Sequence, residues 1–260
     1  MKHLRSVGIR EWKDLDREHL QRFRDHIVKA VAQSSAHTMC AELKAFLGRR
    51  DDLLDLPRHW REILDVPNLK SVRTYLTPEE IDAFAAVEPQ SRHERTVQYD
   101  FLIECLTGMR VSDALALTPE NFQKRKRGYL LSYVSIKTKT PATIPVSRKV
   151  LEMVVWVKEF GTKNSSISNY NQTIRELARR AGIDTPTKVF RAGKSVTAPK
   201  WKLLSSHVGR ISFVNNMADA GVTINNIAMM SGHRNVNTCF GYIVHHEVAL
   251  TEAAKKVLGL

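Results

Sequence analysis

The sequence predicts a mainly α-helical protein with a small β-sheet or hairpin, divided into two parts. Apolar residues recur at helical spacing over most of the 260 residues, which is the pattern of helices that bury one face. Residues 129–136 are instead rich in β-forming side chains, and a short return strand follows at 142–146. A capping-box motif at Thr77 opens a new helical region. We therefore place a domain boundary between residues 74 and 75.

The first part, residues 1–74, is predicted to be a short helical domain. Residues 11–33 carry apolar side chains at helical spacing with charged residues between them, which predicts one amphipathic helix or a broken pair. A second helix is expected over 36–48. Pro57 and Pro67 interrupt the segment that follows, so we expect short pieces and a linker up to the domain boundary.

The second part, residues 75–260, begins with a helix whose start three residues specify. Thr77 is the expected N-cap, Pro78 takes the first helical position and Glu80 completes the capping box. A basic turn over 124–128 leads into the strands, and Pro145 belongs at an edge or strand end because its nitrogen has no hydrogen to donate. The helices of this part are expected over 77–87, 92–107, 111–117, 148–159, 168–181, 206–220, 223–230 and 247–257.

The composition favours a basic soluble protein that acts on nucleic acid. There are 40 lysines and arginines against 27 aspartates and glutamates, which gives a formal net charge of +13, and such a field attracts polyanions. The charge alone would also fit a merely basic soluble protein. The three cysteines match neither a metal-ligand spacing nor a disulfide framework, and no signal peptide or membrane-spanning run is visible. We therefore expect a cytoplasmic protein with no membrane partner.

Two arginines are candidates for binding a phosphodiester. An enzyme that attacks this linkage must offset charge on its non-bridging oxygens, and a guanidinium does so with two parallel hydrogen bonds. Arg110 follows Thr107-Gly108-Met109, and Arg210 ends the run Ser206-His207-Val208-Gly209-Arg210. His207 precedes Arg210 by three residues and would share its helical face. Taken singly, each arginine is more often a surface salt bridge, and the His-x-x-Arg spacing is a weak signal.

Tyr242 is the candidate nucleophile. A phenol, with a pKa of about 10, attacks only where cationic donors stabilise the phenolate, and the two arginines with His207 and His233 would supply them. His233 follows a glycine, which permits close approach to a ligand. The leaving oxygen needs a proton, and Lys137 or Lys139 on the hairpin turn could donate it as general acid. The ordinary role of a tyrosine is packing, and that of a turn lysine is solvation or a simple phosphate contact.

These motifs, in this order, resemble the catalytic domain of the tyrosine recombinases (phage integrases) over about residues 75–245. The shared features are Thr-Gly-x-Arg, a hairpin lysine, His-x-x-Arg, Gly-His and a tyrosine nine residues after that histidine. The resemblance implies a helical core-binding domain at 1–74 and a catalytic domain at 75–260 that ends in a C-terminal helix. The residues that it assigns to the catalytic site are Arg110, Lys137, His207, Arg210, His233 and Tyr242.

The resemblance also implies a role for each of these residues. The arginines would clamp the scissile phosphate, the histidines would hydrogen-bond it and assist proton transfer, and the tyrosine would attack it to give a 3′-phosphotyrosyl link. Lys137 stands eight residues before Pro145, which is the spacing of the family's general-acid lysine and favours it over Lys139. Asp113, three residues after Arg110, matches an acidic position that supports the active site; its ordinary role would be that of a surface acid.

The function implied by the resemblance is site-specific recombination or integration of double-stranded DNA, as in a mobile element. It implies no ATP, metal or other cofactor, and no metal-ligand cluster is visible in the sequence. It further implies a homo-oligomer, a tetramer on DNA, with accessory DNA-bending proteins as candidate partners. The C-terminal helix, within residues 247–260, would either pass to a neighbouring subunit or pack on its own core.

Two other functions are compatible with the sequence. A protein of the same fold could bind DNA without cutting it, which would fit a first part shorter than the family's usual core-binding domain. An unrelated helix-turn-helix regulator would use Ala220-Gly221-Val222 as its turn. Gly209 is also unusual inside a helix, where glycine costs about 1 kcal/mol relative to alanine, and it predicts a looser active-site helix.

Overall fold

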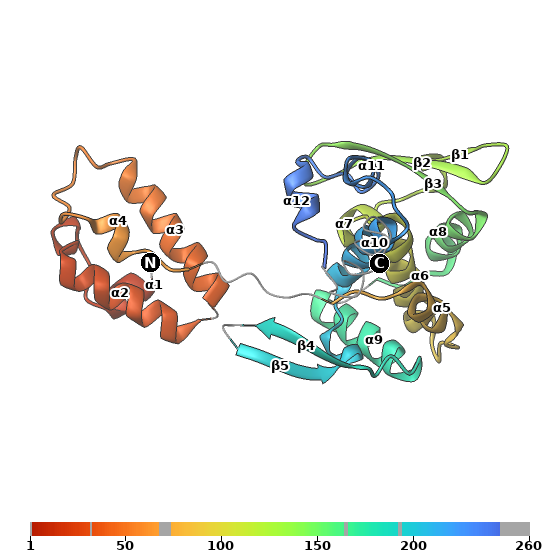
Figure 1. Ribbon diagram of the computed structural model, residues 1–260, viewed down its shortest axis with the longest axis horizontal. Coiled ribbons are helices and arrows are strands. Elements are labelled where there is room, and N and C mark those ends of the chain that lie inside the picture. The colour runs from red at the N-terminus through yellow and green to blue at the C-terminus, as the bar shows by residue number, and fades with distance from the viewer. Residues whose placement is uncertain (1, 32, 68–73, 164–165, 192–193, 245–260) are drawn as a thin grey trace, which may run out of the picture. The chain divides into compact units, whose positions relative to one another are not determined.

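The structure is a computed structural model that describes residues 2–31, 33–67, 74–163, 166–191 and 194–244 (Figure 1). It is mostly helical, with small sheets, as predicted. The chain forms two compact units, residues 1–72 with 189–196 and residues 73–188 with 197–260. We call them the N-terminal unit and the C-terminal unit. The functional roles predicted for 1–74 and 75–260 remain predictions.

The N-terminal unit is built from short and medium helices around one core. Residues 11–33 form a broken pair, because a 3₁₀ turn is followed by a helix whose N-cap, Asp16, accepts a hydrogen bond from the backbone of His19 at 2.9 Å. The next helix begins at Gln33, three residues before the predicted start. The elements are α1 (Lys2–Ser6), η1 (Trp12–Asp14), α2 (Arg17–Ala30), α3 (Gln33–Gly48) and α4 (Trp60–Ile63). Their buried core includes Leu20, Phe23, Ile27, Ala36, Cys40, Leu47 and Trp60.

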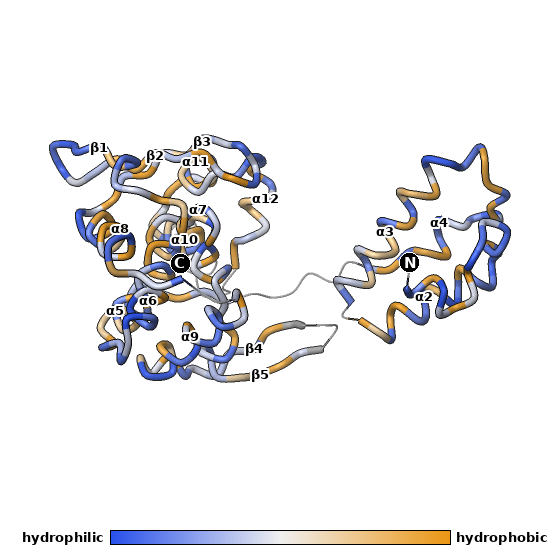
Figure 2. The backbone as a smooth tube through the Cα atoms, turned by 180° about the vertical axis from the view of Figure 1, so that it is seen from behind, coloured by the Kyte–Doolittle hydropathy of each residue, from blue (hydrophilic) through white to orange (hydrophobic). Residues whose placement is uncertain are grey.

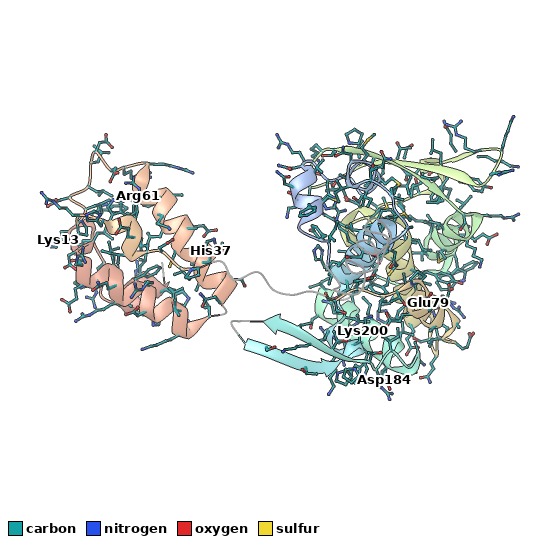
Figure 3. The ribbon with its side chains drawn as sticks, in the orientation of Figure 1. Lys13, His37, Arg61, Glu79, Asp184 and Lys200 are labelled. Atoms are coloured by element: carbon teal, nitrogen blue, oxygen red, sulfur yellow. The ribbon has the colours of Figure 1, made fainter. Side chains whose placement is uncertain are left out.

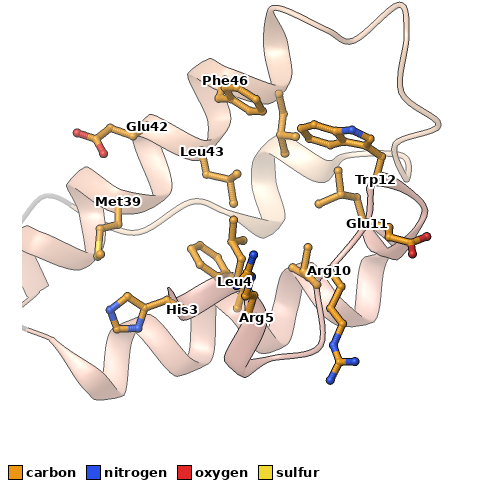
Figure 4. Close-up of a pocket in the computed structure, with 14 residues that line it drawn as sticks. His3, Leu4, Arg5, Arg10, Glu11, Trp12, Met39, Glu42, Leu43 and Phe46 are labelled. Carbon is orange, nitrogen blue, oxygen red and sulfur yellow. The ribbon is translucent and has the colours of Figure 1, made fainter. Parts of the chain in front are cut away.

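A cavity of about 490 Å³ opens in the N-terminal unit (Figure 4). Apolar side chains form most of its lining, and they come from α1, η1, α2, α3 and the residues between these elements. The rings of Trp12 and Phe46 stack there with centroids 5.8 Å apart. None of the six predicted catalytic residues lines this cavity.

The C-terminal unit is organised around one buried helix, α6 (Arg92–Thr107), which contacts five other helices and one strand of this unit. The predicted capping box is present at the start of α5 (Pro78–Ala86). Thr77 Oγ1 accepts from the backbone N–H of Glu80, and a Glu80 carboxylate oxygen accepts from the backbone N–H of Thr77. The other helices are α5 (Pro78–Ala86), α7 (Val111–Ala114), η2 (Pro119–Asn121), α8 (Arg148–Phe160), α9 (Ile167–Arg180), η3 (Lys200–Leu203), α10 (Ser206–Asp219), α11 (Ile224–Met230) and α12 (Val236–Phe240). The predicted helix 247–257 lies outside the described residues.

A three-stranded antiparallel sheet covers one side of the C-terminal unit (Figure 1). Its strands are β1 (Phe122–Lys124), β2 (Tyr129–Val134) and β3 (Pro141–Val146), in that order. Pro145 lies on the edge strand β3, as predicted. A second hairpin, β4 (Pro186–Arg191) with β5 (Lys194–Pro199), was not predicted. Lys200, labelled in Figure 3, follows this hairpin and pairs with Glu80 at 2.5 Å.

Hydrophilic and hydrophobic residues alternate along the helices in Figure 2, which is the pattern of helices with one buried face. Among the described residues, no helix combines the length and hydrophobicity that crossing a lipid bilayer requires.

The glycine inside α10 has a packing role that the sequence did not reveal. A Cβ atom at Gly209 would lie 2.8 Å from the Cβ of Glu104 on α6, closer than two carbons can approach without a shift. Glycine therefore lets α6 and α10 pack closely along their buried faces. This close packing offsets the loss of helix propensity at Gly209, and whether the helix is looser stays a prediction.

Two acids are buried side by side on α6. Glu104 is fully buried and accepts a hydrogen bond from the hydroxyl of Tyr170 at 2.9 Å. Asp100 is also buried, and its Oδ2 atom has no hydrogen-bond partner among the described residues. Burial raises the pKa of Asp100 from an ordinary 3.8 to about 7, against the lowering effect of the Lys158 charge. The pKa of Glu104 is also raised by burial.

We expect the stability of the protein to fall as the pH rises from 5 to 8. Between pH 5 and the folded-state pKa of about 7, the folded state holds the Asp100 proton that the unfolded chain has already lost, and this advantage is gone by pH 8. The free energy of unfolding should fall by about 2–3 kcal/mol relative to Asp100→Asn, which cannot titrate. Urea unfolding at several pH values measures this difference. Asp82→Asn, at an exposed position on α5, is the control and should keep the wild-type slope; parallel profiles for wild type and Asp100→Asn would contradict the prediction.

Candidate active site

Arg110 lies at the junction between α6 and α7, where a glycine ends the first helix. Gly108 is the C-cap of α6 with φ +67°, and Arg110 is the N-cap of α7. The Arg110 Nη1 atom donates to Ser135 Oγ at 3.0 Å, and Ser135 Oγ donates to Asp113 at 3.1 Å. Asp113 also accepts from the backbone N–H of Ile136 at 2.8 Å and is buried. It is therefore not a surface acid: it ties the end of β2 to α7 and, through Ser135, orients Arg110.

Arg210 is fully buried on α10 and is held by backbone rather than by an acid. Its Nη1 atom donates to the carbonyl oxygens of Gly108 and Ser231, each at 2.6 Å. Its Nε and Nη2 atoms have no partner among the described residues. Burial lowers the pKa of Arg210, and the neighbouring charge of Arg110 lowers it further. The ordinary alternative, a surface salt bridge, is wrong for this residue.

His233 is buried next to Arg210 in a defined tautomer. The hydroxyl of Ser231 donates to the carbonyl of Ile227 at 2.5 Å, so its oxygen must accept from His233 Nδ1, which lies 2.7 Å away. The Nε2 atom then carries a lone pair, and among the described residues it has no partner. Burial, followed by the charges of Arg210 and Arg110, lowers the pKa of His233 to about 3. The ring is therefore neutral, and its Nε2 atom presents a lone pair as a hydrogen-bond acceptor.

Tyr242 follows α12 and packs against the predicted site residues. Its ring centroid lies 5.2 Å from that of His207 and 5.1 Å from that of His233, and the Arg210 guanidinium carbon lies 5.8 Å from it. Buried Asn215 on α10 fixes this segment, since its side chain donates to the Tyr242 carbonyl at 3.0 Å and accepts from the backbone N–H of Val244 at 2.7 Å.

The predicted general acid is separate from this cluster. Lys137 and Lys139 are exposed in the turn between β2 and β3, where Lys139 has a positive φ of 54°. Between them, Thr138 donates to the carbonyl of Gly232 at 3.4 Å. Thr138 also lines an open cavity of about 630 Å³ together with Arg110, His233 and residues 234–238. The structure thus brings five of the six predicted residues together and leaves Lys137 exposed on the turn beside this cavity.

Three polar residues of the site were not identified from the sequence. Ser135, Ser231 and Asn215 hold Arg110, His233 and the Tyr242 segment respectively. Ser135 reaches Arg110 across 25 positions of sequence, and Asn215 reaches Tyr242 across 27. No local motif marks such residues. The alternation of buried and exposed positions along β2 is one sequence signal, because continuing it one residue past the strand places Ser135 on the inner face.

The helical fold and its cluster of arginines, histidines and a tyrosine define the class of the tyrosine recombinases. The family model described as the phage integrase family matches residues 74–248. The chain belongs to the phage integrase family, as the sequence predicted. This membership excludes an unrelated helix-turn-helix regulator.

The chain shares limited sequence identity with an individual relative. The chain is 25% identical over 200 residues to a protein named "Prophage ps2 probable integrase" from Lactococcus lactis subsp. lactis (strain IL1403), a match that covers 69% of this chain. It spans about half the length of that curated relative, 52%.

Solved structures share the fold at low sequence identity. The XerH site-specific recombinase bound to a palindromic difH substrate superposes with a TM-score of 0.68 at 15% identity, over 94% of this chain and 72% of that one. A lambda integrase dimer bound to a COC′ core site gives 0.66 at 14% identity, over 93% and 84%. At these identities the comparison supports the fold.

Proposed function

We propose that this protein is a site-specific DNA recombinase or integrase that cleaves and rejoins DNA through a 3′-phosphotyrosyl intermediate. The observation that carries the proposal is the packing of Tyr242 against Arg210 and His233, beside Arg110. Two buried nitrogens of Arg210, Nε and Nη2, have no hydrogen-bond partner among the described residues. A phosphodiester supplies the anionic oxygens that such donors require.

The proposed step is an in-line displacement at phosphorus. The Tyr242 oxygen forms a bond to phosphorus while the bond to the 5′-oxygen breaks, which leaves a 3′-phosphotyrosyl strand and a 5′-hydroxyl. Arg110 and Arg210 offset the charge on the non-bridging oxygens. The phenolic proton passes to Nε2 of His233, whose lone pair has no partner among the described residues. Its basicity rises when the bound phosphate offsets the charges of Arg210 and Arg110, which together with burial lower its pKa. The ring of His207 also packs against the tyrosine ring. Lys137 gives the 5′-oxygen its proton once DNA brings the turn to the site.

The partner of this site is double-stranded DNA. The net charge of +13 supports binding to a polyanion, and both structural relatives named above were solved on DNA. Assembly as a tetramer on DNA, accessory DNA-bending proteins, a place in a mobile element and action in the cytoplasm are parts of the same proposal.

Covalent trapping tests the proposal. Purified protein is incubated with a nicked suicide duplex made from the DNA that flanks its gene, and a denaturation-resistant adduct is sought. We expect an adduct with wild type and none with Tyr242→Phe, because the mutant lacks the attacking oxygen. Tyr99→Phe, which alters a partly buried tyrosine packed against Trp156 on α8, is the matched control and should retain the adduct.

Two outcomes would contradict the proposed function. An adduct that persists in Tyr242→Phe would show that another residue is the nucleophile. DNA bound and retarded by wild type without an adduct, on a set of sites that spans both flanks, would favour the alternative of a DNA-binding protein that does not cut.

A further inference from the structure

Two buried polar side chains accompany the two arginines: Tyr133 near the end of β2 and Ser135 just after that strand. Side chains two residues apart on a strand point to the same face, and Tyr133 and the following Ser135 are both buried there. Ser135 already holds Arg110 through a hydrogen bond. Tyr133 interacts with the other arginine, since the charge of Arg210 acts on its phenol more strongly than any other charge.

The hydroxyl of Tyr133 is buried and makes no well-formed hydrogen bond to a described residue, but it lies close enough to the Arg210 side chain for a weak one, which lowers the pKa of the phenol against the larger effect of burial. It lies 3.1 Å from the position that a Cβ atom on Gly232 would take. The sequence neighbours of Gly232 are Ser231, whose carbonyl binds Arg210, and His233. The charges of Arg210 and Arg110 both act on this phenol. Only 9% of the residue is exposed. A buried hydroxyl that lacks a well-formed hydrogen bond costs free energy, and a hydrogen bond to Arg210 would offset that cost.

The hydrogen-bond capacity of Arg210 leaves one donor that a phosphate does not use. A guanidinium has five N–H groups, and the two on Nη1 are taken by the carbonyls of Gly108 and Ser231. The three on Nε and Nη2 have no partner among the described residues. A phosphate bound side-on by two parallel hydrogen bonds takes two of them. The third N–H is then left without an acceptor unless the protein supplies one.

We propose that Tyr133 is a positioning residue for Arg210, whose hydroxyl oxygen accepts this third N–H when a phosphodiester occupies the other two. The contact fixes the plane of the guanidinium in the orientation that fits the phosphate. This inference rests on the proposed function of the site.

Tyr133 does not compete with Tyr242 as a nucleophile. Burial raises the pKa of Tyr133 to about 12, and its small exposed fraction leaves the oxygen out of reach of a DNA strand. Its proton therefore stays on the phenol, and its contribution is geometric.

Single-turnover trapping of Tyr133→Phe tests the inference. The variant keeps the ring and removes only the oxygen, so we expect the rate of adduct formation to fall about tenfold, the effect of one lost hydrogen bond at the transition state. The melting temperature and the affinity for DNA should be unchanged. Tyr129→Phe, four residues earlier on the same strand, is the matched control and should react at the wild-type rate.

A double-mutant cycle separates positioning from a local structural role. In an Arg210→Lys background, where the planar fork is gone, Tyr133→Phe should slow the reaction by less than twofold. An equal tenfold loss in both backgrounds would overturn the role in positioning Arg210. A wild-type rate for Tyr133→Phe in a wild-type protein that forms the adduct would overturn this inference alone, whereas no adduct from wild type would overturn the proposed function with it.

Discussion

Arg210→Lys is expected to slow DNA cleavage by about 100- to 1000-fold, the usual effect of losing one preorganised donor at a reacting centre. Lysine keeps the positive charge, but it cannot donate at once to the Gly108 and Ser231 carbonyls and present two parallel N–H groups to a phosphate. The rate of adduct formation under single-turnover conditions measures the loss. The charge is unchanged, so the affinity for DNA should change little.

The control for this substitution is Arg175→Lys. Arg175 also donates to a backbone carbonyl, that of Leu204 at 3.0 Å, and it belongs to none of the predicted site motifs. It should react at close to the wild-type rate. Thermal melting of both variants shows whether the fold is intact; a folded Arg210→Lys protein with wild-type cleavage would contradict the role of the guanidinium fork.

Gly108→Ala is expected to destabilise the protein by about 3–5 kcal/mol. Gly108 adopts φ +67°, and a Cβ atom there would lie 2.4 Å from Cδ1 of the Phe213 ring. The substitution therefore adds a steric clash in the core to the backbone strain of a left-handed residue. Because the Gly108 carbonyl also binds Arg210, cleavage should fall together with stability. Urea unfolding measures the first effect and covalent trapping the second.

A second glycine separates the clash from the strain. Gly182 has a similar φ of +71°, but nothing lies within 4 Å of the position that its Cβ would take. Gly182→Ala should cost only about 1 kcal/mol. Equal losses of stability at both positions would contradict the clash with Phe213. Phe213→Leu in the Gly108→Ala background should recover part of the stability, because it opens space beside the added methyl group.

The helices with strong local signals could be predicted closely from the sequence. The predicted bounds 92–107 agree with those of α6, since Ser91 caps its start and Gly108 ends it. The strand β1, the hairpin of β4 and β5, and α12 were not predicted. They are three to six residues long, too short for a periodic pattern to stand out. Their formation depends on neighbours that are distant in sequence.

In the candidate site too, residues in local motifs could be predicted, and residues that act through distant contacts could not. Arg110, Arg210 and Tyr242 were identified because they lie in motifs with a fixed order. Their supports were not, since a buried serine such as Ser135 looks in sequence like any other serine. Asp113 was expected to be either a support or a surface acid, and only the tertiary contact with the backbone of Ile136 separates the two.

The two hydrogen bonds made by Asn215 bear on which copy of this chain supplies each residue of a reaction centre. They fasten the backbone after α12 to α10, which holds Tyr242 against Arg210 of the same chain. In this conformation the proposed nucleophile and the proposed phosphate ligand belong to a single polypeptide. An assembly of such chains would then hold complete reaction centres, one per copy, each able to act on its own strand, and mixing copies defective in different residues would not rebuild a working centre.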